Sequence, residues 1–129
     1  MVIDSSALLA ILLGEPEAQA FARSIADDPT RLLSAVSALE TAIVIQTKKG
    51  RPGGVELDLL MHKAQIEIVA MDTEQVGLAR AAYDKFGKGH PARLNLGDCC
   101  AYALSRSSGE PLLYRGEDFS RTDVPRVPC

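Results

Sequence analysis

The sequence predicts an α/β protein in which helices cover both faces of a mainly parallel sheet. Short apolar runs alternate with longer segments whose apolar residues recur at helical spacing, which is typical of successive strand–helix units. Of the 129 residues, 47% are hydrophobic and 24% are charged, as in an average folded globular protein. We find no internal repeat and no low-complexity tract, so a single domain is expected over residues 1–129.

Short apolar runs carry the strand prediction. Residues 1–4 are apolar and end in Asp-Ser-Ser, which favours a change from strand to capped helix. Residues 66–70 are rich in β-branched side chains, which strands favour. Further candidates are residues 32–33 and 111–114, and residues 124–127 could add an edge strand.

Six segments are predicted to be helices from the spacing of their apolar residues. The predicted helices span residues 8–13, 17–26, 36–48, 55–64, 73–86 and 98–106. The Gly-Arg-Pro-Gly-Gly run at 50–54 is predicted to be a loop, and it lacks the Gly-Lys-Ser/Thr order of a phosphate-binding P-loop. Residues 87–97 are predicted to be irregular, because they are rich in glycine and basic residues.

Charge and cysteine content exclude several classes of protein. The 14 basic and 17 acidic side chains give a formal net charge of −3, so the chain lacks the basic excess that usually accompanies broad electrostatic attraction to nucleic acid. Any such contact needs local basic patches or bound metal ions. The spacing of Cys99, Cys100 and Cys129 fits neither a disulfide framework nor a zinc site, and the adjacent pair is expected in the core. The apolar stretch 7–13 is too short to span a bilayer. We therefore expect a cytoplasmic protein with no membrane segment.

Four acidic residues stand out by their positions. Asp4 follows the first predicted strand, Glu40 lies in a nearly apolar helix that should be largely buried, Asp98 opens a helix, and Asp118 follows a strand. Each has a structural alternative: a helix cap for Asp4, an exposed helix edge for Glu40, a favourable helix dipole for Asp98 and a solvated turn for Asp118. Glu117 and Asp123 compete with Asp118 for any role.

The four acids together predict a metal site. In a parallel sheet, ligands collect at the carboxyl ends of the strands, where these residues fall. Carboxylates gathered in one cleft repel each other unless a cation neutralises them. Mg²⁺ or Mn²⁺ prefers such oxygen ligands and readily binds phosphate oxygens, which suits phosphodiester cleavage.

Four segments, in order along the chain, resemble PIN-domain ribonucleases of the VapC toxin type from bacterial toxin–antitoxin systems. These segments are VIDSSAL (2–8), SALETA (37–42), LNLGDCCAYA (94–103) and LLYRGEDF (112–119). The resemblance implies a three-layer α/β/α sandwich and a metal-dependent endoribonuclease.

The resemblance also implies roles for particular residues. Asp4, Glu40 and Asp98 would bind Mg²⁺, with Mn²⁺ as a possible substitute, and the fourth acid falls on Asp118 or Glu117. Ser6 would orient a water molecule or a phosphate. A VapB-like antitoxin and a homodimer are the expected partners besides RNA, with the helices near 9–25 and 36–47 as docking surfaces for the antitoxin.

Two basic groups are candidates for guiding RNA to such a site. Lys88 and Arg93 belong to one group, which also includes Lys85 and His90 and leads to Asp98. The other group comprises Lys48, Lys49 and Arg51, and a solvated charged face is the alternative for both. With three Tyr, three Phe and no Trp, recognition of RNA shape or of a structured loop is expected rather than of a stacked single strand.

Other functions fit the sequence less well. A phosphoaspartyl transferase generally needs an aspartate two residues after the nucleophile, where this chain has Ser6. His62 and His90 are expected to be a surface or packing residue and a loop residue rather than catalytic bases. A catalytically silent PIN-like scaffold or binding module is the remaining alternative, and the complete acid set argues against it.

Overall fold

Four short parallel strands form the sheet in the computed structural model, which describes residues 1–129. The strands span Val2–Ile3 (β1), Leu32–Ser34 (β2), Glu67–Val69 (β3) and Leu112–Leu113 (β4). Their order across the sheet is β3-β2-β1-β4, and every neighbouring pair is parallel. In this register Val2 lies opposite Leu32 on one side and Leu112 on the other. The carboxyl ends of all four strands therefore lie at one edge.

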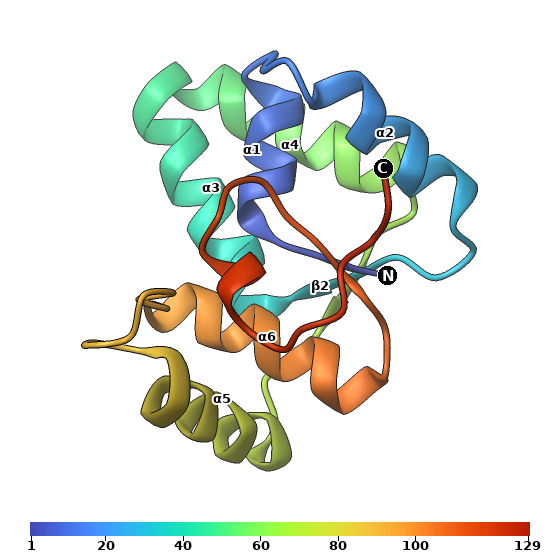
Figure 1. The fold of residues 1–129 in the computed structure, drawn as a ribbon. Coiled ribbons are helices and arrows are strands. Elements are labelled where there is room, and N and C mark those ends of the chain that lie inside the picture. Colours follow the sequence, from blue (N-terminus) through green and yellow to red (C-terminus); the bar gives the residue numbers. More distant parts are fainter.

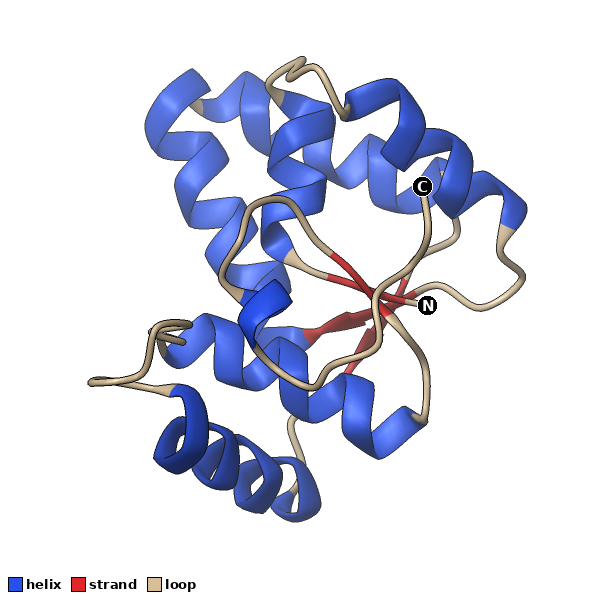
Figure 2. Cartoon of the chain, viewed as in Figure 1, coloured by secondary structure: helices blue, strands red, loops and turns tan.

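Six helices surround this sheet (Figures 1 and 2). They span Ser5–Leu12 (α1), Ala18–Asp27 (α2), Ala35–Lys49 (α3), Arg51–Lys63 (α4), Thr73–Phe86 (α5) and Leu96–Ser108 (α6), and a 3₁₀ turn covers Phe119–Arg121 (η1). In Figure 1, α1 to α4 lie on one side of the sheet and α5 and α6 on the other. The predicted three-layer α/β/α architecture is confirmed.

Alternate residues of the strands pack into two separate hydrophobic cores, one on each face of the sheet. Val2 and Leu112 pack with apolar side chains of α5 and α6, among them Phe86. Ile3 and Leu33, on the opposite face of the sheet, pack with side chains of α1 to α4. This alternation follows from the pleat of a strand, which sends successive side chains to opposite faces.

Three helices begin two to four residues earlier than predicted, and in two of them, α1 and α6, a polar side chain caps the helix. The helix α1 begins at Ser5 rather than at residue 8, because the Asp4 side chain accepts a hydrogen bond from Ser6 N. The helix α6 begins at Leu96 rather than at residue 98, because Asn95 and Asp98 form a reciprocal capping box. These caps place candidate site residues at helix starts.

The predicted loop at 50–54 is wrong, because α4 begins at Arg51. Pro52 lies in the first turn, where its missing N–H breaks no helical hydrogen bond. Gly53 is buried against α3, and a Cβ there would lie 2.6 Å from Ile45 O. The glycine therefore allows the two helices to pack closely.

The candidate edge strand at 124–127 is also absent as a strand. Only an isolated parallel bridge joins Arg126 to Leu112. Pro125 and Pro128 flank this bridge and have no N–H with which to extend a ladder.

The helix α3 is less buried than its apolar composition predicts. It buries a single face, formed by Ser37, Thr41 and Ile45, which recur every fourth residue. On the other side Leu39 is 63% exposed and Ile43 is 57% exposed. An apolar helix in a small domain finds a packing partner on only part of its circumference, so α3 carries an exposed apolar surface.

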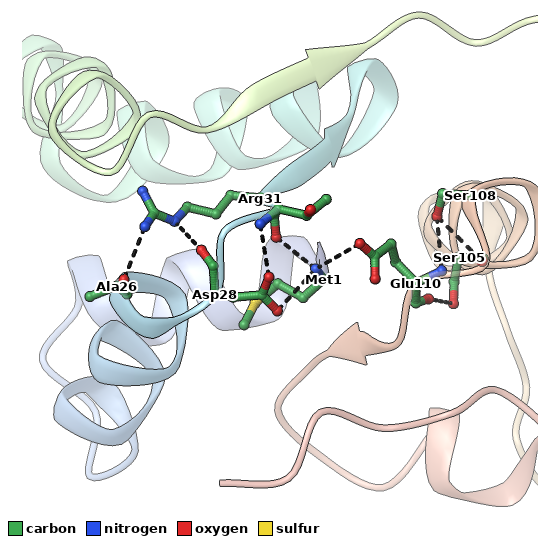
Figure 3. Close-up of polar contacts among 8 residues, drawn as sticks. Met1, Ala26, Asp28, Arg31, Ser105, Ser108 and Glu110 are labelled. Atoms are coloured by element: carbon green, nitrogen blue, oxygen red, sulfur yellow. Dashed lines mark hydrogen bonds and ion pairs between the residues drawn. The ribbon is translucent and has the colours of Figure 1, made fainter.

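Polar contacts hold the start of β1 at the edge of the sheet opposite the strands' carboxyl ends (Figure 3). The Met1 ammonium donates to Asp28 Oδ2 at 3.2 Å and to Thr30 O at 2.6 Å, and it lies 3.7 Å from Glu110 Oε1. Arg31 donates to the backbone carbonyls of Ala26 and Asp28 in the same turn and to that of Ala64 at the end of α4. This network fixes the register of the first strand.

Two further sequence predictions concern cysteines and membrane helices. Cys99 and Cys100 are unpaired and buried in α6, and Cys129 is exposed, as expected. None of the six helices combines the length and the apolar character that a bilayer span requires.

Candidate active site

Asp4 is the most buried carboxylate of the chain, with 3% of its surface exposed. It directly follows β1 and caps α1, and its Oδ2 accepts from Ser6 N at 3.0 Å and from Ser6 Oγ at 2.5 Å. Burial raises the pKa of Asp4 to about 6; the two bonds from Ser6 oppose this rise, and the negative charges of Asp98 and Glu40 add to it. These three carboxylates are therefore close enough for their charges to interact.

Glu40 projects from the second turn of α3 toward the starts of α1 and α6. Its Oε1 accepts a hydrogen bond from Ser5 Oγ at 2.8 Å. On the other side it lies against Gly97, where an added Cβ would be 2.6 Å from both carboxylate oxygens. A side chain at residue 97 would therefore displace this carboxylate from the first turn of α6.

Asp98 combines the helix-start role with a place in the acidic cluster. Its Oδ2 accepts from Asn95 N at 3.1 Å, and its own N–H donates to Asn95 Oδ1 at 2.9 Å. Burial raises the pKa of Asp98, the bond from Asn95 opposes this rise, and the charges of Asp118 and Glu40 add to it. Asp98 therefore stabilises the start of α6 and also lies among the acids of the candidate site, so its structural and functional interpretations are compatible.

Asp118 differs in its contacts from Glu117 and Asp123, which compete with it for a role at the site. It is exposed at the start of η1, and its charge acts on Asp98. Asp123 is instead engaged by Tyr102 Oη at 2.5 Å and by Lys85 Nζ at 3.5 Å. Glu117 lies near Ser120, whose hydroxyl is 3.4 Å from Glu117 Oε2.

The donor set matches a hard divalent cation, although no three of these side chains stand in ready coordination geometry. Asp4, Glu40 and Asp98 each have one oxygen held by a protein donor. Their remaining oxygens, Asp4 Oδ1, Glu40 Oε2 and Asp98 Oδ1, accept no hydrogen bond from the protein. Because neighbouring carboxylates repel each other, a bound cation would be needed to bring these free oxygens together.

The other predicted site residues divide into two groups. Ser6 lies in the cluster, where its hydroxyl donates to Asp4 and accepts from Arg115 N at 3.0 Å. Lys88 and Arg93 are exposed in the segment between α5 and α6 and form no hydrogen bond or ion pair with the acids. The Arg93 backbone has a positive φ of 51°, which marks the tight turn that leads into α6.

Sequence reasoning missed two residues beside the acids. It considered Ser5 only as part of the Asp-Ser-Ser sequence that opens a helix, although the Ser5 hydroxyl donates a hydrogen bond to Glu40. It gave Arg115 no role, yet its side chain pairs with Glu17 Oε2 at 2.8 Å and with Glu15 Oε2 at 3.4 Å and ties the segment after β4 to the turn between α1 and α2. These contacts join residues far apart in sequence, so no local sequence pattern predicts them.

An apolar groove of about 310 Å³ opens beside Glu40. We call it the α3–α6 groove. Its apolar lining comprises Val36, Leu39, Ile43, Val44 and Leu96. Leu96 is 77% exposed, so the groove presents large apolar side chains to solvent next to the acidic cluster.

Comparisons with known proteins agree with this architecture. The PIN domain family model matches residues 1–125. The chain is 55% identical to Ribonuclease VapC of Mycolicibacterium smegmatis, over 98% of this chain and 99% of that protein. It is 52% identical to Ribonuclease VapC30 of Mycobacterium tuberculosis, over 98% of each.

Solved structures share the fold at low sequence identity. Mycobacterium tuberculosis VapC20, described as a sarcin-ricin loop cleaving toxin, has a TM-score of 0.77 at 17% identity, with 98% of this chain and 97% of that one covered. VapBC2 from Rickettsia felis, bound to a promoter DNA fragment, has a TM-score of 0.74 at 14% identity, with 98% and 96% covered. With the family match and the relatives above, the chain belongs to the PIN-domain family, among its VapC ribonucleases.

Proposed function

We propose that this VapC ribonuclease is a metal-dependent endoribonuclease whose ion is Mg²⁺, with Mn²⁺ as a substitute. Asp4, Glu40, Asp98 and Asp118 would hold the ion. The observation that carries this proposal is the proximity of these side chains. Burial is the largest cause of the raised pKa of both Asp4 and Asp98, and the charges of nearby acids add to it: Asp98 and Glu40 act on Asp4, and Asp118 and Glu40 act on Asp98. Acids from four distant parts of the chain thus lie close enough for their charges to interact.

The chain's own groups supply orientation and charge at this site. Ser6 holds one oxygen of Asp4, Ser5 one oxygen of Glu40 and Asn95 one oxygen of Asp98, which leaves the second oxygen of each for a ligand. A divalent ion, when bound, lowers the pKa of a coordinated water and offsets charge on a phosphodiester. No histidine is needed as a base.

Neither histidine contacts the acidic cluster. His62 is exposed on α4. His90 lies in the loop before α6, where its Nδ1 accepts from Ala92 N at 3.0 Å and its ring packs edge-on against Phe86. Both observations support a site built on carboxylates alone.

RNA is the proposed substrate, and Lys88 and Arg93 are the proposed guides for its backbone. Both side chains are exposed, and neither forms an ion pair within the chain, so each is available to a phosphate. Lys85 is less available, because it pairs with Asp123. The net charge of −3 makes such local contacts necessary.

Removal of the metal tests the proposed reaction directly. The purified chain should cleave RNA with Mg²⁺ or Mn²⁺, lose at least about 100-fold in rate with EDTA and recover when the ion is restored, because the ion supplies the activated water. Cleavage is measured on an end-labelled RNA, with Ca²⁺ as the matched control ion. Cleavage at full rate in EDTA would exclude this mechanism, and no cleavage with any ion would favour the silent PIN-like scaffold.

We further propose that the chain is the toxin of a VapBC-type system and that a VapB-like antitoxin covers the α3–α6 groove. Exposed Leu39, Ile43 and Leu96 offer apolar anchor points, and the neighbouring acids would attract a basic side chain of the partner. Among solved structures with this fold is a toxin–antitoxin complex from Klebsiella pneumoniae, with a TM-score of 0.69 at 18% identity and with 92% of this chain and 89% of that one covered.

A charge placed in the groove tests this surface. Leu39→Asp and Ile43→Asp should each weaken binding of the co-expressed antitoxin by about 10-fold or more, because a buried leucine or isoleucine contributes about 1.5–3 kcal/mol. Affinity is measured by calorimetry on the purified chains. Val55→Asp, at an equally exposed position of α4 outside the groove, is the control and should bind normally. Equal affinity for all three variants would place the antitoxin elsewhere.

Two further parts of the proposal concern assembly and location. Homodimerisation is proposed from the family resemblance, and exposed Leu59 on α4 and Val76 and Tyr83 on α5 offer apolar surface for it. A reducing cytoplasm suits three unpaired cysteines.

A further inference from the structure

Two adjacent serines at the start of α1 each hold a different carboxylate of the candidate site. Ser6 Oγ donates to Asp4 at 2.5 Å, and Ser5 Oγ donates to Glu40 at 2.8 Å, across 35 positions of sequence. We propose that Ser5 is a positioning residue that orients Glu40 for the metal, an inference that rests on the metal-dependent function proposed above. Ser5 would act through Glu40 and would not touch the ion or the RNA.

Glu40 needs such a contact more than the other acids do. Asp4 and Asp98 have short side chains, and each is held through a backbone N–H at a helix start. Glu40 has a longer side chain in the middle of a helix, so fixing it loses more rotamer freedom. Among the protein's groups only Ser5 donates to its carboxylate.

The position of Ser5 makes it a rigid donor. It is the first residue of α1, only 9% exposed, and only Asp4 separates it from the buried β1. Its hydroxyl takes Oε1 and leaves Oε2 without a protein donor. A hydrogen bond to one oxygen of a ligating carboxylate fixes the direction of the other, and the loss of such outer contacts typically weakens metal binding by about 10–100-fold.

Gly97 forms the opposite wall of this arrangement. A Cβ at residue 97 would be 2.6 Å from both oxygens of Glu40, so the carboxylate lies directly against the backbone of α6. Asp98 is the next residue in the chain. Contact with Ser5 on one side and Gly97 on the other therefore holds Glu40 against the backbone segment that carries Asp98.

The same helix provides a matched control. Ser37 lies one turn before Glu40 on α3 and is fully buried, but its Oγ has no hydrogen-bond partner. Ser37→Ala therefore removes a buried hydroxyl close to Glu40 in sequence without removing any contact to its carboxylate. It should leave both metal binding and cleavage unchanged.

The experiment compares Ser5→Ala, Ser5→Thr and Ser37→Ala with the wild-type chain. Mn²⁺ binding is measured without RNA by calorimetry, and RNA cleavage is measured over a series of Mn²⁺ concentrations. We expect Ser5→Ala to raise the Mn²⁺ dissociation constant and the Mn²⁺ concentration for half-maximal cleavage by about 10–100-fold. The KM for RNA at saturating Mn²⁺ should be unchanged, and Ser5→Thr, which keeps the hydroxyl, should restore most of the affinity. Thermal unfolding without metal verifies that each variant folds.

Two results would overturn the inference. One is a Mn²⁺ affinity of folded Ser5→Ala within twofold of wild type, and the other is an equal loss of affinity in Ser37→Ala. Wild-type metal binding separates these results from a failure of the proposed function. If the wild type binds Mn²⁺ and cleaves RNA while Ser5→Ala does both equally well, only the role of Ser5 is wrong. If the wild type itself neither binds Mn²⁺ nor needs it, the metal-dependent function fails as well.

Discussion

Asp98→Asn is expected to reduce RNA cleavage by at least about 100-fold while the chain stays folded, because losing a ligand should cost more than losing an outer contact. The substitution removes the charge that the proposed metal site needs. It keeps a side-chain oxygen that can accept from Asn95 N, so the reciprocal cap of α6 survives. Cleavage is measured at saturating Mn²⁺, and folding is measured by urea denaturation.

Glu117→Gln serves as the matched control for this result. Glu117 is an exposed acid adjacent to Asp118, and its charge does not contribute to the raised pKa of Asp98. Its replacement should leave cleavage within about twofold of wild type, whereas Asp118→Asn should lower it. Undiminished cleavage by Asp98→Asn would contradict the proposed site, and loss of cleavage in Glu117→Gln but not in Asp118→Asn would move the fourth acid to residue 117.

The layer architecture could be predicted because it depends on local periodicity. The predicted helix at 73–86 coincides with α5, and the predicted strands at 1–4, 32–33, 66–70 and 111–114 each overlap one of β1 to β4. The misplaced helix starts have two origins: capping side chains extend α1 and α6, whereas α4 begins in a sequence that is typical of a loop. At Arg51 a Pro-Gly-Gly sequence reads as a loop, but Pro52 is harmless in a first turn and Gly53 is required by the close packing on α3.

The acidic residues of the candidate site could also be predicted from the sequence, but the residues that hold them in place could not. Strand ends and the apolar surroundings of Glu40 single out the carboxylates. The hydrogen bond from Ser5 to Glu40 and the close approach of Gly97 depend on how α1, α3 and α6 meet. The exposed side of α3 could not be predicted either, because composition does not show which face of a helix packs against another element.

The metal-free chain is expected to lose stability as pH rises from about 4 to about 7, in part because of Asp4. Its carboxyl has a pKa of about 6 in the folded state against 3.8 for an unperturbed aspartate, so the folded state holds the proton more tightly. The stabilisation from this bound proton is fully present below pH 3.8 and is lost as pH rises through 6. The difference corresponds to about 3 kcal/mol in the free energy of unfolding. Urea denaturation in EDTA across this range measures it.

Asp4→Asn isolates this contribution, because it keeps an acceptor for Ser6 and cannot ionise. At pH 7 without metal it should be more stable than wild type by up to about 3 kcal/mol, and the gap should close near pH 4. Asp123→Asn gives the opposite sign as a control: the bond from Tyr102 lowers the pKa of Asp123, so its stabilisation is present above pH 3.8 and lost as pH falls.

Added Mn²⁺ connects this pH dependence to the site. An ion that binds the folded chain through ionised Asp4 offsets the cost of that buried charge, so Mn²⁺ should stabilise wild type more at pH 7 than at pH 5. Asp4→Asn should gain little from Mn²⁺ at either pH. If Mn²⁺ stabilised the variant and the wild type equally, the ion would bind away from Asp4. If the free energy of unfolding without metal had the same pH dependence in both chains, burial would not raise the pKa of Asp4. The buried charge that destabilises the metal-free chain is therefore what favours the binding of a cation.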